Sequence, residues 1–368
     1  MALGIYIHIP FCTKKCPYCD FYSVPYIDDT AERYTCALLR AIESYKDKNL
    51  AADTVYFGGG TPNLLGSERI EKILSAIKGA FDLSDNAEIT MEANPETFCA
   101  QDISAFKKAG VNRLSLGLQS ANRDELASLG RTHTPDEVLY CIEKASAAGI
   151  CNISLDLMLG IERQTKQSLL SSIEFCKNAG AAHISAYLLK IEPNTPFYKK
   201  QSILNLPDDD ESAELYEFAC TELKKRGYEQ YEISNFAKNG LISRHNTKYW
   251  LCEEYLGLGA AAHGFYKGER YHYERSIEDF IKNPIKTVSD GAGGSADEAL
   301  MLALRLSNGI DIEQFEKRYC LSFSPVFHKT AEQFVKAGLM QKTQNRISIT
   351  PKGFLVSNSI IADLISLM

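Results

Sequence analysis

Three cysteines lie close together near the N-terminus, in the stretch YIHIPFCTKKCPYCDFYS (residues 6–23). Cys12, Cys16 and Cys19 fall within eight residues, directly after an isoleucine-rich segment that predicts a β-strand. Thiolates at this spacing are ligands for zinc or for an iron–sulfur cluster, and structural sites of both kinds use four protein ligands. Three ligands on a four-iron cluster leave one iron open. The missing fourth thiol therefore predicts a cluster that binds a substrate or cosubstrate.

The remaining cysteines do not gather in this way. Isolated cysteines are most often small buried hydrophobic residues, and we expect this of the other eight. They are Cys36, Cys99, Cys141, Cys151, Cys176, Cys220, Cys252 and Cys320. The group of three stands apart as the candidate metal-binding motif. A zinc-dependent structural module remains an alternative interpretation of it.

The composition is that of an ordinary globular protein. The chain has 368 residues, of which 45% are hydrophobic and 24% charged, enough for two or three structural units. The net charge of −7 argues against nucleic acid as the main partner. No 18-residue apolar run is present, and the segment MALGIYIHIPF lacks the cationic start of a secretory signal. We expect a cytoplasmic protein.

Short β-rich segments alternate with helical patterns over the first 200 residues. The strand candidates are residues 4–9, 54–57, 88–93, 113–119, 152–159 and 183–189. Amphipathic stretches such as SERIEKILSAIKGAF lie between them. Six βα units in series predict an α/β fold with a parallel sheet, in the form of a partial (β/α)6 barrel.

The strand candidates alternate between apolar and polar residues. Ile5, Ile7 and Ile9 share one face of the first strand, whereas Tyr6 and His8 share the other. The same alternation recurs in the strands at 88–93, 113–119, 152–159 and 183–189. Because the apolar face must meet the helices, the polar face lines the lumen. A lumen lined by polar side chains predicts a cavity that holds a polar ligand, unlike a barrel packed with branched aliphatic residues.

Polar and glycine residues follow several of these strands. The turn GGGTP (58–62) comes directly after the second strand, where glycines let the backbone approach a ligand closely. Glu92, Gln119 and Asp156 lie at the C-terminal ends of the third, fourth and fifth strands, where barrels bind their ligands. For each carboxylate taken alone, helix capping or ion pairing is a competing explanation.

The chain after residue 200 divides into two further predicted units. Residues 201–289 form a linking α/β segment that contains the stretch RHNTKYW (244–250). A glycine-rich stretch at 290–300 is typical of a linker and opens a unit over 290–368, whose helices and short strand pair resemble a winged helix. From Asp297 onward eight Lys or Arg face seven Asp or Glu, a net of +1 that does not indicate DNA binding.

The motif CTKKCPYC is similar to the C-x3-C-x2-C signature of radical S-adenosylmethionine (SAM) enzymes. This resemblance implies a 4Fe–4S cluster on Cys12, Cys16 and Cys19, with the open iron chelated by the amine and carboxylate of SAM. In that superfamily an electron from the reduced cluster cleaves SAM to a 5′-deoxyadenosyl radical. The chain also resembles the oxygen-independent coproporphyrinogen III oxidases, and this resemblance implies which of its residues contact SAM. The matching positions here are Tyr6, Tyr18, Gly59, Gly60, Thr61, Glu92, Gln119, Arg131 and Asp156.

Similarity to the HemW family of heme chaperones runs over nearly the whole chain. It rests on the segments YIHIPFC, YFGGGTP, RLSLGLQS, LGRTHTPDE, IEPNTPFY, GYEQYEISNFAK, RHNTKYW and YLGLGAAAHG. The oxidases carry a further cysteine two residues after the third ligand and a longer N-terminal extension. Here Phe21 occupies that position and only eleven residues precede Cys12. The loop DLMLGIERQT departs from relatives at Ile161 and Glu162, a change that we expect to leave SAM binding intact.

The stretch RHNTKYW resembles the H-N-x-x-Y-W motif that the HemW family links to heme. The resemblance implies His245 as a heme ligand, with Tyr249 and Trp250 as flat apolar surface for the macrocycle. Without the resemblance, a histidine beside the only tryptophan is more often a packing or hydrogen-bonding residue. For His8 and His263 that structural interpretation is preferred.

The leading hypothesis is a heme chaperone on a radical SAM scaffold, with the 4Fe–4S cluster, SAM and heme as cofactors and no assigned catalytic residue. Its implied partners are heme, an apo-hemoprotein recipient, an electron donor protein and the membrane surface, but not nucleic acid. The alternative is a tetrapyrrole-modifying oxidoreductase of the oxygen-independent coproporphyrinogen III oxidase type.

Overall fold

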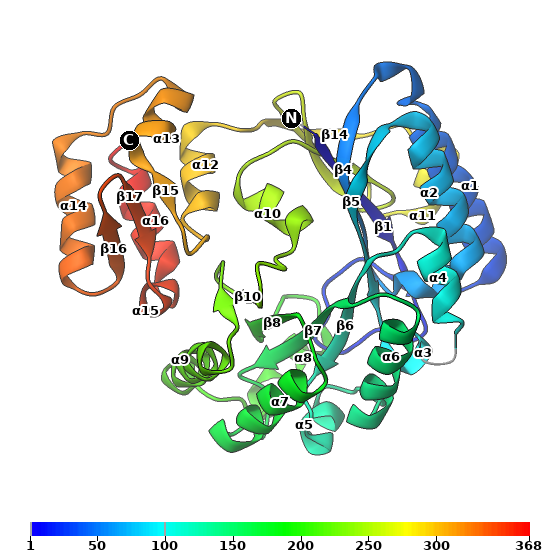
Figure 1. Cartoon of the computed structure of the whole chain (residues 1–368), viewed down its shortest axis with the longest axis horizontal. Coiled ribbons are helices and arrows are strands. Elements are labelled where there is room, and N and C mark those ends of the chain that lie inside the picture. The colour runs from blue at the N-terminus through cyan, green and yellow to red at the C-terminus, as the bar shows by residue number, and fades with distance from the viewer. Residues whose placement is uncertain (1, 99–100) are drawn as a thin grey trace.

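In a computed structural model, which describes residues 2–98 and 101–368, six parallel strands curve into a partial barrel (Figure 1). They are hydrogen-bonded in chain order. The strands are β1 (Leu3–Ile9), β4 (Ala51–Gly59), β5 (Asp82–Ala93), β6 (Arg113–Gln119), β7 (Asn152–Leu159) and β8 (His183–Leu188). The six predicted strand segments are confirmed, two of them to the residue, and with them the partial (β/α)6 barrel.

Amphipathic helices cover the outer face of the sheet (Figure 1). The longer ones are α1 (Asp28–Glu43), α2 (Ser67–Ala80), α4 (Ile103–Ala109), α6 (Pro135–Ala147), α7 (Lys166–Asn178) and α9 (Asp209–Lys225). Short turns of helix join them: η1 (Lys46–Lys48), η2 (Pro62–Leu65), α3 (Pro95–Phe98), α5 (Arg123–Ser128), α8 (Pro196–Lys199) and η3 (Gln201–Ile203). In α1 the buried Tyr34, Leu38 and Ile42 recur every fourth residue and so lie on one face, which meets the sheet.

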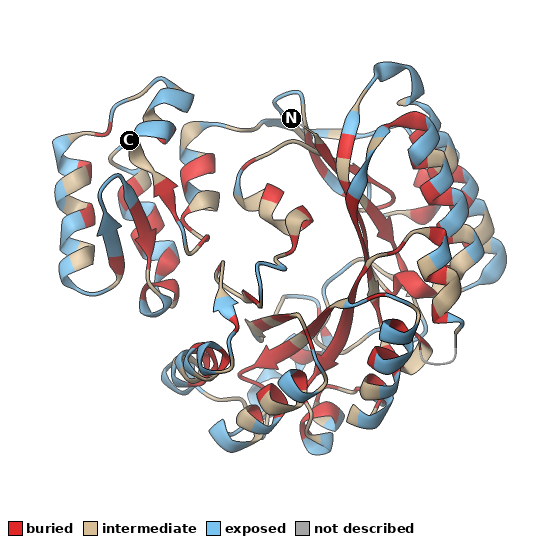
Figure 2. Ribbon diagram, viewed as in Figure 1, coloured by how far each residue is buried: buried red, intermediate tan, exposed pale blue. Residues whose placement is uncertain are grey.

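The two faces of the strands differ in polarity as the alternation predicts. Ile5, Ile7 and Ile9 are fully buried in the hydrophobic core shared with the helices. Figure 2 shows that the strands of the barrel are largely buried. The opposite face carries polar side chains that hydrogen-bond across the lumen from strand to strand. The Ser154 hydroxyl, for example, lies 2.7 Å from Nδ1 of His183. The buried polar residues of this face include Thr54, Glu88, Thr90, Arg113, Ser115, Ser154 and His183. The polar lumen is confirmed.

Strands from the middle of the chain extend both edges of the same sheet, which has twelve strands. Beside β8 lie β10 (Asn235–Ala237) and β9 (Glu229–Gln230); beside β1 lie β11 (Tyr255–Leu258), β12 (His263–Tyr266), β13 (Glu269–His272) and β14 (Val288–Ala292). The helices α10 (Arg244–Trp250) and α11 (Ile277–Lys282) connect them. The start of the glycine-rich stretch at 290–300 belongs to β14, because it pairs with β13 as the outermost strand.

The C-terminal unit has its own three-stranded sheet, as the winged-helix-like interpretation requires, and its buried residues are continuous with the main hydrophobic core. Its elements are α12 (Ala296–Ala303), β15 (Ile310–Asp311), α13 (Ile312–Tyr319), α14 (Pro325–Lys336), β16 (Met340–Thr343), β17 (Arg346–Ile349), α15 (Pro351–Phe354) and α16 (Ser357–Ile365). The stacked rings of Phe323 and Phe327 lie 4.0 Å apart at its centre. It meets the rest of the molecule through α12, which packs against α10 (Figure 1).

The scattered cysteines divide between core and surface. Cys141, Cys176, Cys220 and Cys252 are buried, as expected. The expectation is wrong for Cys36, Cys151 and Cys320, which are exposed because they lie on outward helix faces or at chain turns. Cys99 lies outside the described residues. In the part of the chain that the structure describes, no helix has the length and apolar character needed to cross a membrane.

Candidate cofactor site at the mouth of the barrel

The cysteine loop lies between β1 and α1 and is fixed at both ends. The short strands β2 (Phe11–Cys12) and β3 (Val24–Pro25) pair with each other and close the loop. Within it the N–H of Cys19 donates to the carbonyl of Cys16 at 3.1 Å, and the N–H of Phe197 donates to the carbonyl of Pro17 at 3.0 Å. The three cysteines are partly exposed and free. Their thiols are therefore held in place and accessible.

The three thiols are close enough to affect each other but do not converge on one point. Burial raises the pKa of the Cys19 thiol, and the nearby thiols of Cys16 and Cys12 raise it further. Among the described residues, one group of three metal-ligating side chains has its ligand atoms all within 4.8 Å of one another, and it is not this one. The three thiols are therefore not gathered around one point as the ligands of a single zinc ion are.

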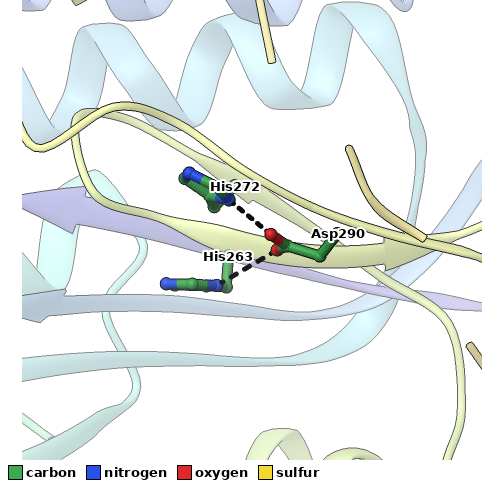
Figure 3. Close-up of side chains that lie close together, drawn as sticks. All are labelled: His263, His272 and Asp290. Atoms are coloured by element: carbon green, nitrogen blue, oxygen red, sulfur yellow. Dashed lines mark hydrogen bonds and ion pairs between the residues drawn. The ribbon is translucent and has the colours of Figure 1, made fainter. Parts of the chain in front are cut away.

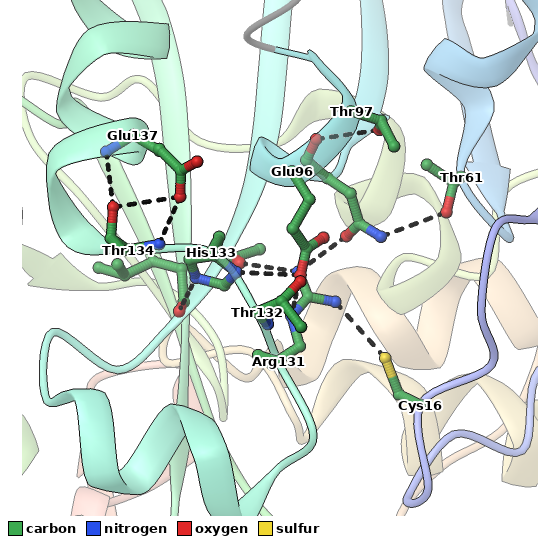
Figure 4. Close-up of polar contacts among 12 residues, drawn as sticks. Cys16, Thr61, Glu96, Thr97, Arg131, Thr132, His133, Thr134 and Glu137 are labelled. Carbon is green, nitrogen blue, oxygen red and sulfur yellow. Dashed lines mark hydrogen bonds and ion pairs between the residues drawn. The ribbon is translucent and has the colours of Figure 1, made fainter.

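Arg131 places a fixed positive charge beside the cysteine loop (Figure 4). Its Nη1 donates to Sγ of Cys16 at 3.5 Å, and its Nη2 donates to Oδ1 of Asn94 at 2.9 Å. Its Nε lies 3.6 Å from Oε1 of Glu96. Burial alone would raise the pKa of Glu96, but the bond to His133 and the charge of Arg131 hold that pKa at about 2. The anionic Glu96 thus anchors the guanidinium that faces the thiol.

The glycine turn after β4 packs directly against the cysteine loop. The N–H of Gly60 donates to the carbonyl of Ile9, and the N–H of Thr61 donates to the carbonyl of Phe11, at 2.8 and 2.7 Å. A Cβ on Gly59 would lie 2.5 Å from the His8 ring, and one on Gly60 would lie 2.6 Å from the Phe11 carbonyl oxygen. These glycines are thus required by packing against β1 and the loop, a reason that the sequence interpretation did not identify. The Thr61 hydroxyl points to Cys12 Sγ at 3.5 Å.

Two carboxylates face the lumen below the cysteine loop. Oε1 of Glu92 accepts from the Tyr56 hydroxyl at 2.8 Å, and its Oε2 accepts from the N–H of Gly59 at 3.2 Å. Oδ1 of Asp156 accepts from the Ser115 hydroxyl at 3.0 Å. Burial raises the pKa of Glu92 to about 7 and the pKa of Asp156 to about 6. A cation between them would favour the ionised form of both carboxylates.

Three further predicted residues border the same space. Gln119 ends β6 in a left-handed conformation, with φ of 65°, and its Oε1 accepts from the Tyr187 hydroxyl at 3.0 Å. The ring of Tyr18 packs edge-on against Phe197. The Tyr6 hydroxyl lies 3.0 Å from Nδ1 of His8. The predicted residues other than His245 therefore belong to one end of the barrel, at or near the C-terminal ends of its strands.

Sequence reasoning missed several residues of this network. Asn94, Glu96 and His133 position Arg131, and Tyr187 fixes the amide of Gln119. Asn94 and Tyr187 could have been found, because each lies at the C-terminal end of a strand already predicted. Glu96 and His133 could not, because their contact joins the short helix α3 to the loop before α6, 37 residues apart in the chain.

His245 lies at the opposite end of the lumen, on α10. Its Nδ1 lies 2.8 Å from the Thr54 hydroxyl, and its Nε2 lies 2.7 Å from the Tyr249 hydroxyl. The ring is fully buried and stacks on Tyr56 with centroids 5.2 Å apart. Burial lowers its pKa to about 3, so the imidazole is neutral. In this conformation both ring nitrogens are occupied, and neither is open to an iron atom.

Helix α10 covers that end of the lumen, and we call this helix the α10 plug. Glu88 accepts from the backbone N–H groups of Arg244 and His245, both at 3.0 Å. The Lys248 ammonium lies 3.0 Å from Oδ1 of Asp53. Trp250 faces the C-terminal unit, where the Arg305 guanidinium lies 5.9 Å from its ring centroid. Thr54 and Gly58 are four residues apart on β4, which puts the plug about 13 Å from the glycine turn.

Comparisons with known proteins agree with this architecture. Residues 6–176 match the Radical SAM superfamily, and residues 295–356 match the HemN C-terminal domain. The chain is 34% identical over 362 residues to "Heme chaperone HemW" of Lactococcus lactis, covering 96% of this chain and 95% of that protein. It is 35% identical over 367 residues to "Heme chaperone HemW" of Bacillus subtilis, covering 96% and 97%.

Among solved structures, coproporphyrinogen III oxidase (HemN) from Escherichia coli, described as a radical SAM enzyme, has the same fold. The TM-score is 0.84 at 19% sequence identity, over 100% of this chain and 91% of that one. At this identity the likeness establishes the fold alone.

Proposed function

The chain belongs to the HemW family of heme chaperones, and from this premise we propose that it binds heme and transfers it to apo-hemoproteins on a radical SAM scaffold. The observation that carries the proposal is similarity to named heme chaperones over almost the full length of both chains. Phe21, which is largely exposed at the position where the oxidases have a further cysteine, supports the same choice.

The residues at the mouth fit an iron–sulfur cluster with one open iron. We propose Cys12, Cys16 and Cys19 as its ligands, because they are free, partly exposed and lie together on one loop whose ends are held by β2 and β3. When bound, such a cluster supplies one-electron chemistry. The Arg131 guanidinium would hydrogen-bond the Cys16 sulfur, and the glycine turn would hold Cys12 through Thr61.

The lumen beneath the loop fits a cationic cosubstrate. SAM carries a sulfonium and an ammonium group, and the half-buried carboxyls of Glu92 and Asp156, whose pKa values are raised, would be stabilised in their ionised forms by such a cation. We propose that Glu92 binds the ammonium group and that Asp156 stabilises positive charge deeper in the lumen. Tyr6, Tyr18, Gly59, Gly60, Gln119 and Arg131 complete the proposed SAM contacts.

For heme we propose a site at α10 that opens relative to the conformation described here. Ligation of heme iron by His245 requires its hydrogen bond to Thr54 or to Tyr249 to break. Removal of the Tyr249 hydroxyl frees Nε2 without emptying the packing around the ring. If His245 is the ligand, Tyr249→Phe strengthens heme binding and His245→Ala weakens it. Unchanged heme titrations in both variants would exclude His245 as the ligand.

The fold likeness to a coproporphyrinogen III oxidase makes that activity the second candidate. One anaerobic experiment separates the two. Reconstituted protein, with a chemical reductant in place of the electron donor protein, is incubated with SAM and either coproporphyrinogen III or heme plus an apo-hemoprotein. We expect heme transfer and no protoporphyrinogen IX. Steady formation of protoporphyrinogen IX would overturn the chaperone proposal.

A further inference from the structure

A second cluster of metal-ligating side chains lies on the three strands at one edge of the twelve-stranded sheet. It consists of His263, His272 and Asp290, which we call the edge cluster (Figure 3). Nδ1 of His272 lies 2.8 Å from Oδ1 of Asp290, and Nδ1 of His263 lies 3.8 Å from Oδ2 of the same carboxylate. The two imidazoles lie 5.4 Å apart, with 30° between their planes. Each residue offers a ligand atom within 4.8 Å of the others.

The backbone brings these residues together from three neighbouring antiparallel strands. His263 on β12 lies directly opposite His272 on β13. On β14, Ser289 pairs with Tyr271 and Gly291 pairs with Arg270, so Asp290 is the extra residue of a β-bulge. A bulge redirects a side chain out of the regular alternation of its strand, here toward the two imidazoles. The ladder thus holds the set, independently of any loop.

We propose that the edge cluster binds a divalent first-row transition-metal ion of the Zn²⁺ class. Two imidazoles and one carboxylate form a ligand set that such ions accept, with further positions left to water. Metal–ligand bonds of about 2.1 Å place two ligands of one ion about 3 to 3.5 Å apart. The two distances to Asp290 lie just below and just above that range. Small side-chain rotations therefore complete the site.

The positive groups nearby are already engaged: Arg270 is paired with Glu298, and Arg275 donates to the backbone carbonyl of Asp20. Their charges reduce the affinity for a cation without blocking access.

A bound ion would tie the edge of the sheet together. β14 is the outermost strand, with residues 289–292 exposed, and it leads directly into α12 of the C-terminal unit. A ligand from each of β12, β13 and β14 links this strand to the body of the barrel. This role is independent of the proposed heme and SAM functions.

Zinc binding to the full-length protein tests the proposal. Cluster-reconstituted wild type, in which the loop thiols are occupied, is dialysed anaerobically against Zn²⁺ and compared with the double variant His263→Ala/His272→Ala. The wild type is expected to bind one more zinc equivalent than the double variant and to show a higher melting temperature with zinc. Equal zinc content in the two proteins would overturn the proposal.

Three controls keep the result decisive. Asp290→Asn preserves the shape of the site and is expected to weaken zinc binding at least tenfold. If the double variant does not fold, this variant tests the proposal in its place. His328→Ala, on α14, matches the loss of an imidazole outside the cluster and should bind zinc as wild type does. A hemin titration should be unchanged in the double variant; loss of hemin binding with zinc binding intact would make the edge cluster a heme site.

Discussion

The two ends of one polar lumen are built differently. At the α10 end, polar groups have protein partners: Glu88 caps two backbone N–H groups, and both nitrogens of His245 are hydrogen-bonded. At the mouth, Glu92 and Asp156 are half-buried with raised pKa values, and within the described residues neither forms an ion pair. Polar groups that are paired within the protein stabilise the fold. The carboxylates at the mouth, which form no ion pair, instead leave a site for a cationic ligand. Substitutions at the two ends should therefore have different consequences.

The largest effect is expected from the cysteines at the mouth. Replacing Cys12, Cys16 or Cys19 with Ser should abolish the brown colour and the electron paramagnetic resonance signal of the cluster, because two thiolates cannot hold it. Cys320→Ser, an exposed and isolated cysteine, is the matched control and should leave both intact. Retention of a full cluster signal in all three loop variants would show that the cluster lies elsewhere.

The next effect concerns SAM affinity at the two ends. Glu92→Gln removes a charged hydrogen-bond acceptor worth about 1.5–3 kcal/mol, so SAM should bind about 10- to 100-fold more weakly. Glu88→Gln at the α10 end should leave SAM affinity within about threefold of wild type. Isothermal titration of the cluster-loaded proteins measures both. Equal losses in the two variants would mean that the ends do not differ as described.

The same two variants should change stability in opposite directions. Glu88→Gln weakens the bonds to the start of α10 and should cost about 1–3 kcal/mol of unfolding free energy. Glu92 has a folded-state pKa of about 7, above its ordinary value of 4.5, so the folded state binds more protons between these values. Ionisation of Glu92 should therefore lower the ligand-free stability as the pH rises from about 5 to about 7.5, by at most about 3 kcal/mol from this group. Asp156 and Glu232, whose pKa values are also raised, add to the decline.

Denaturant titrations across this pH range check the assignment. Glu92→Gln should make the decline shallower and be more stable than wild type at pH 8, because residue 92 then has no charge to acquire, while Asp156 and Glu232 still ionise. A wild-type profile that rises through this window, or an unchanged slope in Glu92→Gln, would contradict the raised pKa of that carboxyl.

The smallest effect is expected from Tyr249→Phe. The variant keeps the ring that packs on Tyr255 and loses a single hydrogen bond to His245, worth about 1 kcal/mol. Thermal unfolding measures the loss, and Tyr45→Phe, at a ring that stacks on Phe81 outside the plug, is the conservative control. A loss well beyond 1 kcal/mol would show that the α10 plug depends on this one bond.

Much of the mouth was predictable from local patterns. The alternation of Ile5, Tyr6 and Ile7 fixes which face of β1 meets the lumen, and the ends of the strands mark Glu92 and Asp156. These signals lie within single segments. Packing between segments cannot be predicted from the pattern of a single segment. The glycines of the turn, for example, are needed because His8 and Phe11 fill the space where a Cβ would lie.

The plug could not be predicted for the same reason. The motif around His245 suggests chemistry, but its burial depends on Thr54 and Tyr56, which are nearly 200 residues earlier in the chain. The edge cluster likewise depends on the register of three strands and on a bulge at Asp290. His263, assigned a structural role from the sequence, belongs to that cluster.

The central claim is that the mouth of this lumen is completed by a three-cysteine cluster and a cationic cosubstrate. The most direct test is electron paramagnetic resonance of the reduced, reconstituted protein before and after addition of SAM. The account predicts a cluster signal that shifts on SAM addition in wild type and shifts far less in Glu92→Gln. A wild-type cluster whose spectrum does not respond to SAM would contradict it.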